Sequence, residues 1–282
     1  MTGVLYLCAT PIGNLEDITL RVLRTLKEVD LIAAEDTRHS IKLLNHYQIK
    51  TPMTSYHEFN KKSKGIQLIE KLKKGQNIAL ITDAGTPAVS DPGEDIVRLA
   101  YKEGITVYSL PGPSACITGL TLSGMDTKRF AFEAFLPTNK NHRRRILAEL
   151  KNETRTIILY EAPHRLLKTL KSLYEYLGDR NITIERELTT KNASIDTTTI
   201  HQAIEKYTKE DPKGEIVLII EGRKWEEIDQ EEQKSWLSLS LEDHMDYYLT
   251  KGIDKKEAMK IVAKDRGLSK REVYNKLIEL DS

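Results

Sequence analysis

Short apolar runs alternate with segments of helical periodicity over the first 110 residues of the chain. Four runs are rich in aliphatic and β-branched residues, as buried strands are. They lie at residues 4–9, 31–34, 78–82 and 106–110. Four segments repeat apolar residues every three or four positions, as amphipathic helices do. They lie at residues 18–28, 39–47, 63–74 and 94–103. This alternation predicts an α/β domain with a mostly parallel sheet.

The same alternation resumes after the string "LPGPSA", and we place a domain boundary near residues 111–115. Further strands are predicted at 129–134, 156–160, 181–188, 194–199 and 215–220. Further helices are predicted at 143–150, 164–177 and 200–208. The pattern predicts a second α/β domain with its own sheet, so that the two domains span residues 1–113 and 114–224.

The last quarter of the chain has a different character. Residues 225–240 are polar and acidic, which is typical of a linker. The string "KKEAMKIVAKDRGLSKREVYNKLIEL" then places a glycine four residues after Ala263 and a capping residue, Ser269, before a second helix. Val273 falls on the inner face of that helix. This spacing predicts a small all-helical domain, similar to a helix-turn-helix, over residues 241–282.

The overall charge is nearly balanced, with 43 Lys and Arg against 42 Asp and Glu, so a nucleic-acid partner has to meet a local basic patch. Residues 138–155 hold six basic and two acidic side chains, and residues 251–276 hold nine and four. We expect RNA contacts in both stretches, and the alternative is a solvated helix surface. The side chains expected to contact RNA are Arg143, Arg144, Arg145, Lys264, Lys270 and Arg271.

Cysteine usage and hydropathy indicate a cytoplasmic protein without a membrane partner. Cys8 and Cys116 show neither CxxC nor histidine-rich spacing, so we expect reduced thiols and no zinc site. The first residues, "MTGVLYLCATPIGN", lack the basic region of a signal peptide and are expected to form a strand. No window reaches the roughly 18 consecutive apolar residues of a membrane helix.

Unusual residues gather where the predicted parallel strands end. The four strands run into "ATPIGNLEDIT", "AAEDTRHS", "TDAGTPAVSDPG" and "LPGPSA". Ligands bind beyond the carboxyl ends of the strands in an open parallel sheet, so these loops predict a site. None is a P-loop, a GxGxxG fingerprint or a GxSxG serine loop, although "NIALITD" alone also fits a strand that ends in a magnesium-binding Asp. Glycines and prolines bring main-chain groups close to a ligand, as for a nucleoside.

Two polar strings beside these loops are candidates for catalysis. "EDTRHS" places Asp36 and Arg38 after the second strand, and "TSYHEFN" places His57 and Glu58 after a short extended run. His57 suits a general base or an orienting group. The alternatives are an ordinary surface histidine for His57 and a structural ion pair between Asp36 and Arg38.

Nine strings occur in the order and approximate spacing of one known family. They are "ATPIGNLEDIT", "AAEDTR", "SYHE", "TDAGTPAVSDPG", "PGPSA", "AFLP", "EAPHR", "RELT" and "GEIVLIIEG". The chain resembles the ribosomal RNA small subunit methyltransferase I family, which belongs to the tetrapyrrole methylase superfamily of class III S-adenosylmethionine (SAM) methyltransferases. The resemblance implies two α/β domains, the first with a mostly parallel sheet and the second with a mixed sheet. It implies SAM in the cleft between them, no metal, and a homodimer. It also implies methylation of the ribose 2′-hydroxyl of a decoding-centre cytidine in the 16S rRNA of the small ribosomal subunit.

Carried residue by residue onto this sequence, the superfamily's SAM contacts fall in both predicted domains. In the first domain they fall on Pro11, Ile12, Gly13, Asp83, Ala84, Gly85, Val89 and Ser90. In the second they fall on Ser114, Ala115, Tyr160, Glu161, Leu188, Thr189 and Glu215. The help in removing the hydroxyl proton is expected from His57, Glu58, Asp36 and Arg38.

The sequence departs locally from the family pattern. Thr82 stands where the superfamily's loop has glycine, Ala162 stands in place of a serine, and residues 190–196 lack the usual Lys-His-Glu run. Phe59 stands where a second histidine is frequent, which removes a paired-histidine base. Two other classes of protein stay open: a SAM methylase of a corrinoid or other small molecule, and a non-enzymatic ribosome-binding protein.

Overall fold

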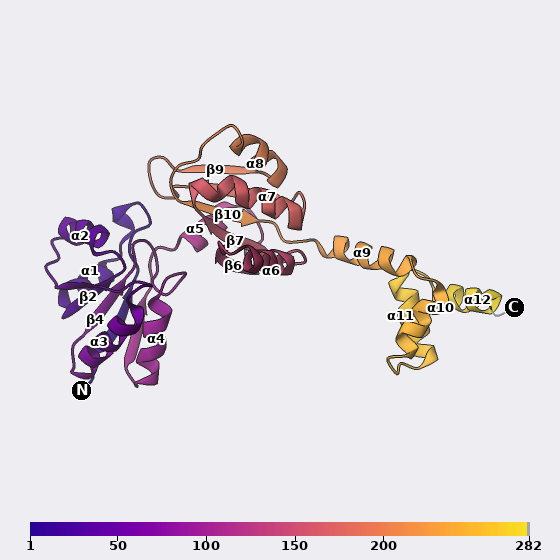
Figure 1. Ribbon diagram of the computed structural model, residues 1–282, viewed down its shortest axis with the longest axis horizontal. Helices are drawn as coiled ribbons and strands as arrows, with labels where there is room; N and C mark the ends of the chain where they lie inside the picture. Colours follow the sequence, from indigo (N-terminus) through magenta and orange to yellow (C-terminus); the bar gives the residue numbers. More distant parts are fainter. Residues whose placement is uncertain (281–282) are drawn as a thin grey trace. The chain divides into compact units, whose positions relative to one another are not determined.

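The computed structural model describes residues 1–280, and these form two compact units (Figure 1). The larger unit consists of Met1–Leu150 and Arg155–Glu221. The smaller unit consists of Lys151–Thr154 and the chain from Gly222 onward. Both predicted sheets therefore belong to the larger unit, and the boundary between the two α/β domains stays a prediction.

Five strands form the first sheet, in the order β3-β2-β4-β1-β5. The strands are β1 (Val4–Cys8), β2 (Leu31–Ala34), β3 (Met53–Ser55), β4 (Ile78–Ile81) and β5 (Thr106–Leu110). Leu5 of β1 pairs with Ile78 of β4 on one side and with Val107 of β5 on the other. Every strand pair in this sheet is parallel, which confirms the mostly parallel sheet predicted from the alternation.

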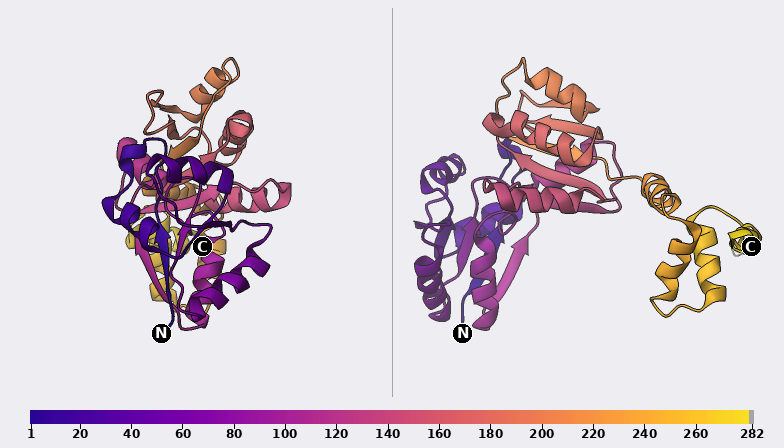
Figure 2. Two further views of the ribbon diagram at one scale, coloured as in Figure 1. Left: turned by 90° about the vertical axis from the view of Figure 1, so that its left-hand side faces the viewer. Right: turned by 45° about the vertical axis from the view of Figure 1, so that its right-hand side comes forward.

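Two helices cover each face of the first sheet, as Figure 2 shows from two further directions. They are α1 (Leu20–Glu28), α2 (Thr37–His46), α3 (Lys61–Lys73) and α4 (Gly93–Lys102), and the short helix η1 (Leu15–Asp17) precedes α1. Helices α1 and α2 pack on one set of strand side chains, which includes Cys8 and Ile32. Helices α3 and α4 pack on the alternate set, which includes Leu5 and Ala33. Burial on both faces explains why these strands form continuous apolar runs in the sequence.

The strand order leaves a crevice at the carboxyl ends of two central strands of the first sheet, β1 and β4. The chain leaves β1 through α1 on one face, whereas it leaves the adjacent β4 through α4 on the other face. Where neighbouring parallel strands send their connections to opposite faces, their carboxyl ends leave room for a ligand. Thr10 and Gly85 join the two loops there, since each main-chain N–H donates to the other's carbonyl oxygen, at 2.9 and 3.1 Å.

The second sheet is mixed, as predicted, in the order β6-β7-β10-β8-β9. Its strands are β6 (Phe130–Phe135), β7 (Thr156–Glu161), β8 (Asn181–Arg186), β9 (Ser194–Thr199) and β10 (Ile216–Ile220). Strand β6 runs parallel to β7, and the other three pairs are antiparallel. All five residues of β10 are buried, because it lies in the middle of the sheet.

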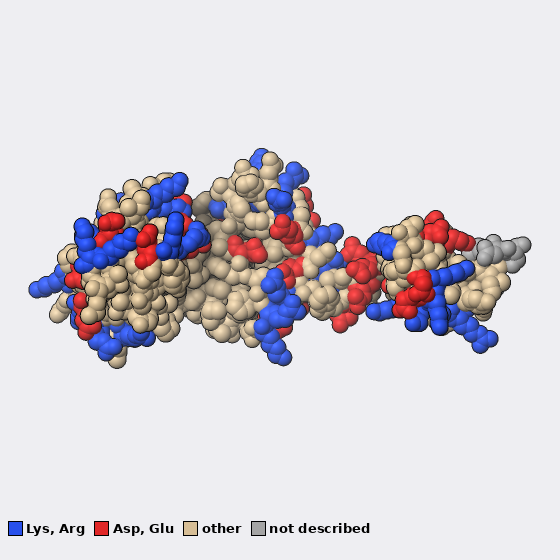
Figure 3. All heavy atoms as spheres, turned by 90° about the horizontal axis from the view of Figure 1, so that it is seen from below, with Lys and Arg blue, Asp and Glu red and all other residues tan. Residues whose placement is uncertain are grey.

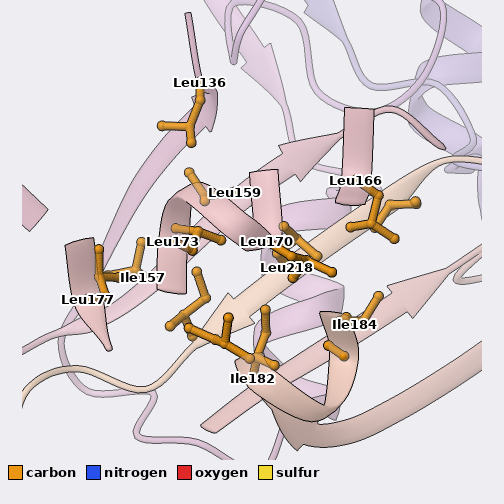
Figure 4. Close-up of a cluster of buried hydrophobic side chains, with 14 of the residues drawn as sticks. Leu136, Ile157, Leu159, Leu166, Leu170, Leu173, Leu177, Ile182, Ile184 and Leu218 are labelled. Carbon is orange, nitrogen blue, oxygen red and sulfur yellow. The ribbon is translucent and has the colours of Figure 1, made fainter. Parts of the chain in front are cut away.

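Unequal layers cover the two faces of the second sheet. The elements around it are α5 (Ala115–Leu122), α6 (Lys140–Leu150), η2 (Pro163–Arg165), α7 (Leu166–Leu177) and α8 (Ile200–Tyr207). Helices α6, α7 and α8 share one large core with the sheet, in which Leu170 and Leu173 meet Leu159, Ile182 and Leu218 (Figure 4). Helix α5 alone covers part of the other face. The alternation of side chains along β7 therefore decides which residues meet α7 and which meet α5.

The smaller unit is all-helical, which confirms the prediction for residues 241–280. Its helices are α9 (Trp225–Leu237), α10 (Leu241–Leu249), α11 (Lys255–Asp265) and α12 (Lys270–Leu280). The Ser269 hydroxyl accepts from the Glu272 N–H at 3.2 Å, and the Ser269 N–H donates to Glu272 Oε2 at 2.7 Å, which is a capping box. Val273 is fully buried, on the inner face of α12. Residues 281 and 282 lie outside the described residues.

Most of the stretch 225–240, which was predicted to be a linker, forms helix α9. Glu226 and Glu227 lie in its first turn and Lys234 in its last, which suits the helix dipole. None of its side chains is buried, so the stretch lacks the apolar periodicity that identifies a helix from sequence. Trp236 stacks on His244 of α10, with ring centres 4.1 Å apart, and fastens α9 to its unit. No helix within residues 1–280 is long and apolar enough to cross a membrane.

Candidate cofactor and substrate site

A pocket of about 370 Å³ opens at the carboxyl ends of β1 and β4. Its lining comes from the loop after β1, one face of α2 and the end of β4. The lining residues are Thr10, Pro11, Gly13, Leu15, His39, Ser40, Lys42, Leu43, His46, Thr82 and Asp83. Three residues predicted to bind SAM, namely Pro11, Gly13 and Asp83, thus come together at one pocket.

The loop after β1 is bonded to the second sheet. The Thr189 hydroxyl donates to the Ile12 carbonyl oxygen at 3.0 Å and accepts from the Asn14 N–H at 3.0 Å. Gly13 between them has φ +132°, and a Cβ there would lie 2.7 Å from Thr189 Oγ1. Only glycine fits this close approach without strain. Thr189 therefore contacts both Ile12 and Gly13, and all three residues are predicted to contact SAM.

The loop after β4 contains two strained positions and a brace. Ala88 and Ser90 have φ +67° and +68°, in the left-handed region that side chains disfavour. The Asp91 carboxylate accepts from the N–H groups of Ala88, Val89 and Gly93 at 3.0, 3.2 and 2.7 Å. Burial raises the pKa of Asp91. Val89 and Ser90, both predicted to contact SAM, are exposed on this braced loop.

Asp83 connects the ends of β2 and β4. Its Oδ1 accepts from the Asp36 N–H at 3.1 Å, and beside it the Thr82 hydroxyl donates to Glu35 Oε2 at 2.6 Å. Burial raises the pKa of Asp83, and the Glu35 carboxylate adds to the effect. Among residues 1–280, no group of three or more His, Cys, Asp or Glu side chains is placed to hold a metal ion.

Four predicted SAM contacts cluster around the start of α5. The Cys116 N–H donates to the Tyr160 hydroxyl at 3.0 Å, and Ala115 and Leu188 pack with Tyr160 in one hydrophobic cluster. Ser114 is the residue directly before α5. Burial raises the pKa of Tyr160 to about 12, so this hydroxyl stays protonated. In the loop after β4, a Cβ at Gly85 would lie 3.7 Å from the Pro113 carbonyl oxygen, which accepts from the Thr86 hydroxyl at 2.9 Å. Ala84 precedes Gly85 in this loop.

Glu161 points to the opposite face of the second sheet from Tyr160. Its side chain is 0 % exposed and bonded to the Thr169 hydroxyl, the Ala162 N–H and Arg165 Nε. These partners lie on the α7 side of the sheet. The Glu161 carboxylate is therefore committed to the core, and only the main chain of this residue is left for the predicted SAM contact.

Glu215 lies just before β10 and feels the charges around the pocket. Burial raises the pKa of Glu215, the Glu187 and Asp83 carboxylates raise it further, and His39 opposes them. The Glu215 N–H donates to Glu187 Oε1 at 3.1 Å. The Glu215 carboxylate thus interacts electrostatically with Asp83, just after β4, and with His39 of α2.

Asp36 and Arg38 form an ion pair, which was one of the two interpretations of these residues from the sequence. Asp36 Oδ2 lies 2.7 Å from Arg38 Nη2, and Asp36 Oδ1 accepts from the Arg38 N–H at 2.8 Å as the cap of α2. These hydrogen bonds lower the pKa of Asp36 to about 2. The Arg38 side chain is 90 % exposed. Within residues 1–280, the pocket lining includes neither residue, although their neighbour His39 belongs to it.

His57 and Glu58 are also engaged outside the pocket lining. His57 Nε2 lies 3.3 Å from Asn60 Nδ2, and its ring lies edge-on to Phe59 at 6.1 Å. Glu58 Oε2 lies 2.8 Å from Lys61 Nζ at the start of α3. Both residues therefore tie the loop after β3 to the next helix.

The predicted RNA contact is wrong for the Arg143 side chain, which is buried. Its Nη2 donates to the hydroxyls of Thr169 and Ser172 at 3.0 and 3.3 Å. Consecutive helix residues point about 100° apart, and Arg143 falls on the face of α6 that packs against α7, whereas its two neighbours do not. Arg144 and Arg145 are exposed, and Arg144 Nε donates to the Tyr176 hydroxyl at 3.3 Å.

The basic residues of the smaller unit lie at its surface. Lys264 and Arg271 are exposed and Lys270 is half-buried. In the view of Figure 3, Lys and Arg side chains gather on one side of this unit, and acidic side chains lie among them.

Sequence reasoning missed the three basic residues of α2 that line the pocket. His39, Lys42 and His46 follow one another at spacings of three and four, so they share one helix face. The string "EDTRHS" contains His39, but strand-end logic singled out only its first residues. The helical period after residue 37, combined with the position of α2 beside β4, places Lys42 and His46 on the same helix face as His39.

The fold and this pocket define a methylase of the tetrapyrrole class. The family model for Tetrapyrrole (Corrin/Porphyrin) Methylases matches residues 4–204. A solved uroporphyrin-III-C-methyltransferase from Thermus thermophilus superposes with a TM-score of 0.57 at 16% identity, covering 78% of this chain and 94% of that one. A diphthine synthase superposes with a TM-score of 0.61 at 13% identity, covering 78% and 90%. At such low identity these two structures show the shared fold.

Closer relatives narrow the class. The ribosomal RNA small subunit methyltransferase I of Halalkalibacterium halodurans is 49% identical over 273 residues, 97% of this chain and 94% of the relative. That of Synechocystis is 45% identical over 281 residues, 99% of both chains. That of Thermotoga maritima is 46% identical over 221 residues, which are 78% of this chain but 99% of the relative. The chain belongs to the ribosomal RNA small subunit methyltransferase I family.

Proposed function

We propose that this protein transfers a methyl group from SAM to the ribose 2′-hydroxyl of a decoding-centre cytidine in 16S rRNA. The observation that carries the proposal is the identity of 45–49% over nearly the whole chain to proteins named ribosomal RNA small subunit methyltransferase I. The pocket supports it, because it lies where glycine loops of the first sheet meet Thr189 of the second. We place the activity in the cytoplasm, where ribosomes are.

The residues around the pocket fit SAM. Gly13 and Gly85 have positive φ and bring the main chain close to a ligand. The carboxylates of Asp83 and Glu215 suit a ligand that carries a sulfonium and an ammonium group. The start of α5 at Ser114 suits a ligand carboxylate, because helix amino termini favour negative charge. When bound there, SAM supplies an electrophilic methyl group.

We propose SAM contacts for all the residues predicted to bind it, with residue 161 contributing main chain only. They are Pro11, Ile12, Gly13, Asp83, Ala84, Gly85, Val89, Ser90, Ser114, Ala115, Tyr160, Glu161, Leu188, Thr189 and Glu215. Holding two reactants in line and excluding water lowers a barrier by about 7–11 kcal/mol. Most of the catalytic contribution of this chain therefore comes from alignment.

The four polar rim residues help by ordering the site. Asp36 and Arg38 fix the end of β2 through their ion pair, and the Asp36 N–H holds Asp83. His57 and Glu58 fix the loop after β3 through Asn60 and Lys61. We propose that these contacts keep the edge of the pocket rigid during methyl transfer.

RNA binding is proposed for the exposed basic residues of both units. In the larger unit these are Arg144 and Arg145, and in the smaller unit Lys264, Lys270 and Arg271. Contacts between such side chains and phosphates release counterions, so the affinity falls as salt rises. A homodimer is also proposed, because Ile117 and Leu122 of the apolar helix α5 are 48% and 46% exposed.

The decisive experiment incubates the purified protein with methyl-labelled SAM and small ribosomal subunits from cells that lack this methylation. We expect label on one ribose 2′-oxygen of 16S rRNA, mapped by blocked alkaline cleavage. Label on a base, or only on an added tetrapyrrole, would contradict the proposal and favour another methylase. Failure to bind SAM in calorimetry would favour a non-enzymatic ribosome-binding protein.

A further inference from the structure

One face of α2 forms a basic wall of the pocket that the roles above do not use. His39, Lys42 and His46 all line the pocket, and all three are exposed to solvent. The loop after β1, with Gly13, and the end of β4, with Asp83, line the same pocket. A substrate in this pocket therefore meets α2, and an RNA segment suits its basic side chains.

His39 is the member of this wall that couples to the carboxylates. Its charge acts on Asp83, at the end of β4, and on Glu215, just before β10. Asp83 is itself held in place, since its Oδ1 accepts from the Asp36 N–H at 3.1 Å. The imidazole therefore shares the pocket lining with Asp83 and acts electrostatically on Glu215, a proposed cofactor residue.

Transfer to a ribose hydroxyl calls for a proton acceptor, because a neutral hydroxyl is a weak nucleophile. Asp36 suits this role poorly, since its bonds to Arg38 lower its pKa to about 2 and make it a weak base. Glu58 is paired with Lys61, and His57 lies against Asn60 and Phe59. His39 combines a basic side chain with a place in the pocket lining.

We propose that His39 is the general base that accepts the proton of the attacking 2′-hydroxyl. This inference rests on the proposed function and names a residue for it. In the step, the hydroxyl oxygen forms a bond to the methyl carbon while the carbon–sulfur bond breaks and its electron pair stays on sulfur. The hydroxyl proton passes to an imidazole nitrogen of His39 and then to solvent. Atoms and charge balance, because the sulfonium becomes a neutral thioether and the released proton carries the charge.

A general base makes methyl transfer depend on pH, and several charged groups act in this region. His39 acts electrostatically on the carboxylates of Asp83 and Glu215, and Glu35 and Asp36 at the end of β2 act on Asp83. The basic groups on its own helix are Arg38, Lys42 and His46. A base must be unprotonated to act, so the rate constant of methyl transfer rises with pH over the range of about 5 to 8 in which histidines titrate. His46 and the carboxylates remain in a His39 variant, so loss of this rise identifies His39.

The test compares His39→Gln and His39→Asn with His201→Gln, a matched change at an exposed histidine of α8. The substrates are saturating labelled SAM and small subunits that lack the methylation, in single turnovers from pH 5.5 to 8.5. We expect both His39 variants to lose about 10²–10⁴-fold in rate and to lose the rise with pH. The His201 variant should match the wild type. SAM affinity in calorimetry and the melting temperature should stay unchanged in all three variants.

Several outcomes would overturn the assignment. A His39 variant with the wild-type rate and pH profile shows that another group or water takes the proton. A loss of SAM affinity or of melting temperature that accounts for the loss of rate shows that His39 binds cofactor or supports the fold. Wild-type protein that methylates no ribose removes the proposed function itself, and the His39 step falls with it.

Discussion

The hydroxyl of Thr189 donates to the carbonyl oxygen of Ile12 at 3.0 Å and so joins the loop after β8 to the loop after β1. The Thr189 hydroxyl oxygen also accepts from the Asn14 N–H at 3.0 Å, and the close approach requires Gly13 between Ile12 and Asn14. These residues are about 175 positions apart in the sequence. The proposed SAM site thus depends on how the two sheets of the larger unit meet.

Removing this hydroxyl should weaken SAM binding while the fold persists. Thr189→Val keeps the shape of the side chain but loses both hydrogen bonds, each worth about 0.5–1.5 kcal/mol. We expect SAM affinity to fall about tenfold, which corresponds to about 1.4 kcal/mol. Titration calorimetry measures it, and Thr189→Ser, which keeps the hydroxyl, should bind nearly as the wild type does. Equal binding by the valine variant would show that the contact is dispensable.

We expect the buried Glu185 to lower the free energy of unfolding of the protein as pH rises. Its side chain is fully buried on β8, and neither carboxylate oxygen has a hydrogen-bond partner within residues 1–280. A Cβ at Gly119 of α5 would lie 2.5 Å from Glu185 Oε2, so the helix packs closely upon it. Burial raises the pKa of Glu185 from 4.5 to about 8.

The sign of this effect follows from proton binding. Between pH 4.5 and about 8 the folded protein keeps a proton at Glu185 that the unfolded chain has lost, so the free energy of unfolding falls as pH rises. Each unit of pKa difference corresponds to about 1.4 kcal/mol. Glu185→Gln should therefore raise the melting temperature more at pH 8 than at pH 5. Glu205→Gln, at an exposed site on α8, is the control, and equal shifts at both pH values would refute the assignment.

Arg143 and its two neighbours should separate folding from RNA binding. Arg143→Ala leaves the hydroxyls of Thr169 and Ser172 without their partner and removes a cation near the buried Glu161, so we expect about 3 kcal/mol less stability. Arg144→Ala and Arg145→Ala should change the melting temperature little. They should lower the affinity for small subunits and flatten its salt dependence. Filter binding between about 50 and 200 mM salt measures both effects. A stable Arg143 variant with weak RNA binding would reverse this division.

Deleting the chain after Gly222 should separate SAM binding from subunit binding. The larger unit ends at Glu221, and the Thermotoga maritima relative matches over 99% of its length while covering only 78% of this chain. A chain of that length accommodates the larger unit without the smaller one. We expect unchanged SAM affinity in calorimetry and weaker binding of small subunits. Parallel loss of both affinities would mean that the smaller unit supports the fold.

Local sequence signals predicted most of the secondary structure. Strands at 31–34 and 106–110 and the mixed second sheet agree with the prediction, because buried strands and glycine turns leave apolar runs with clear ends. Helix α9 was missed because it buries none of its side chains, so its polar sequence has no apolar period to read.

The site was predictable to the level of its loops but less so for individual side chains. Loops after β1 and β4 were expected at one edge, and the pocket lies there. The direction of a side chain depends on its neighbours in space, however. Glu161 points into the core beside α7, Arg143 is buried under the same helix, and His39 lines the pocket because α2 lies beside β4.

The sequence by itself determined the class of the fold, the order of its strands and helices, and the strings that show its family, because each is written in a few consecutive residues. The tertiary structure alone decided which polar groups meet. It brought Thr189 to Ile12 and put His39 in the same pocket lining as Asp83, since contacts over such separations depend on how the strands are ordered and how the sheets pack. Periodicity gives the face of a residue within its own element, and only packing decides what that face meets.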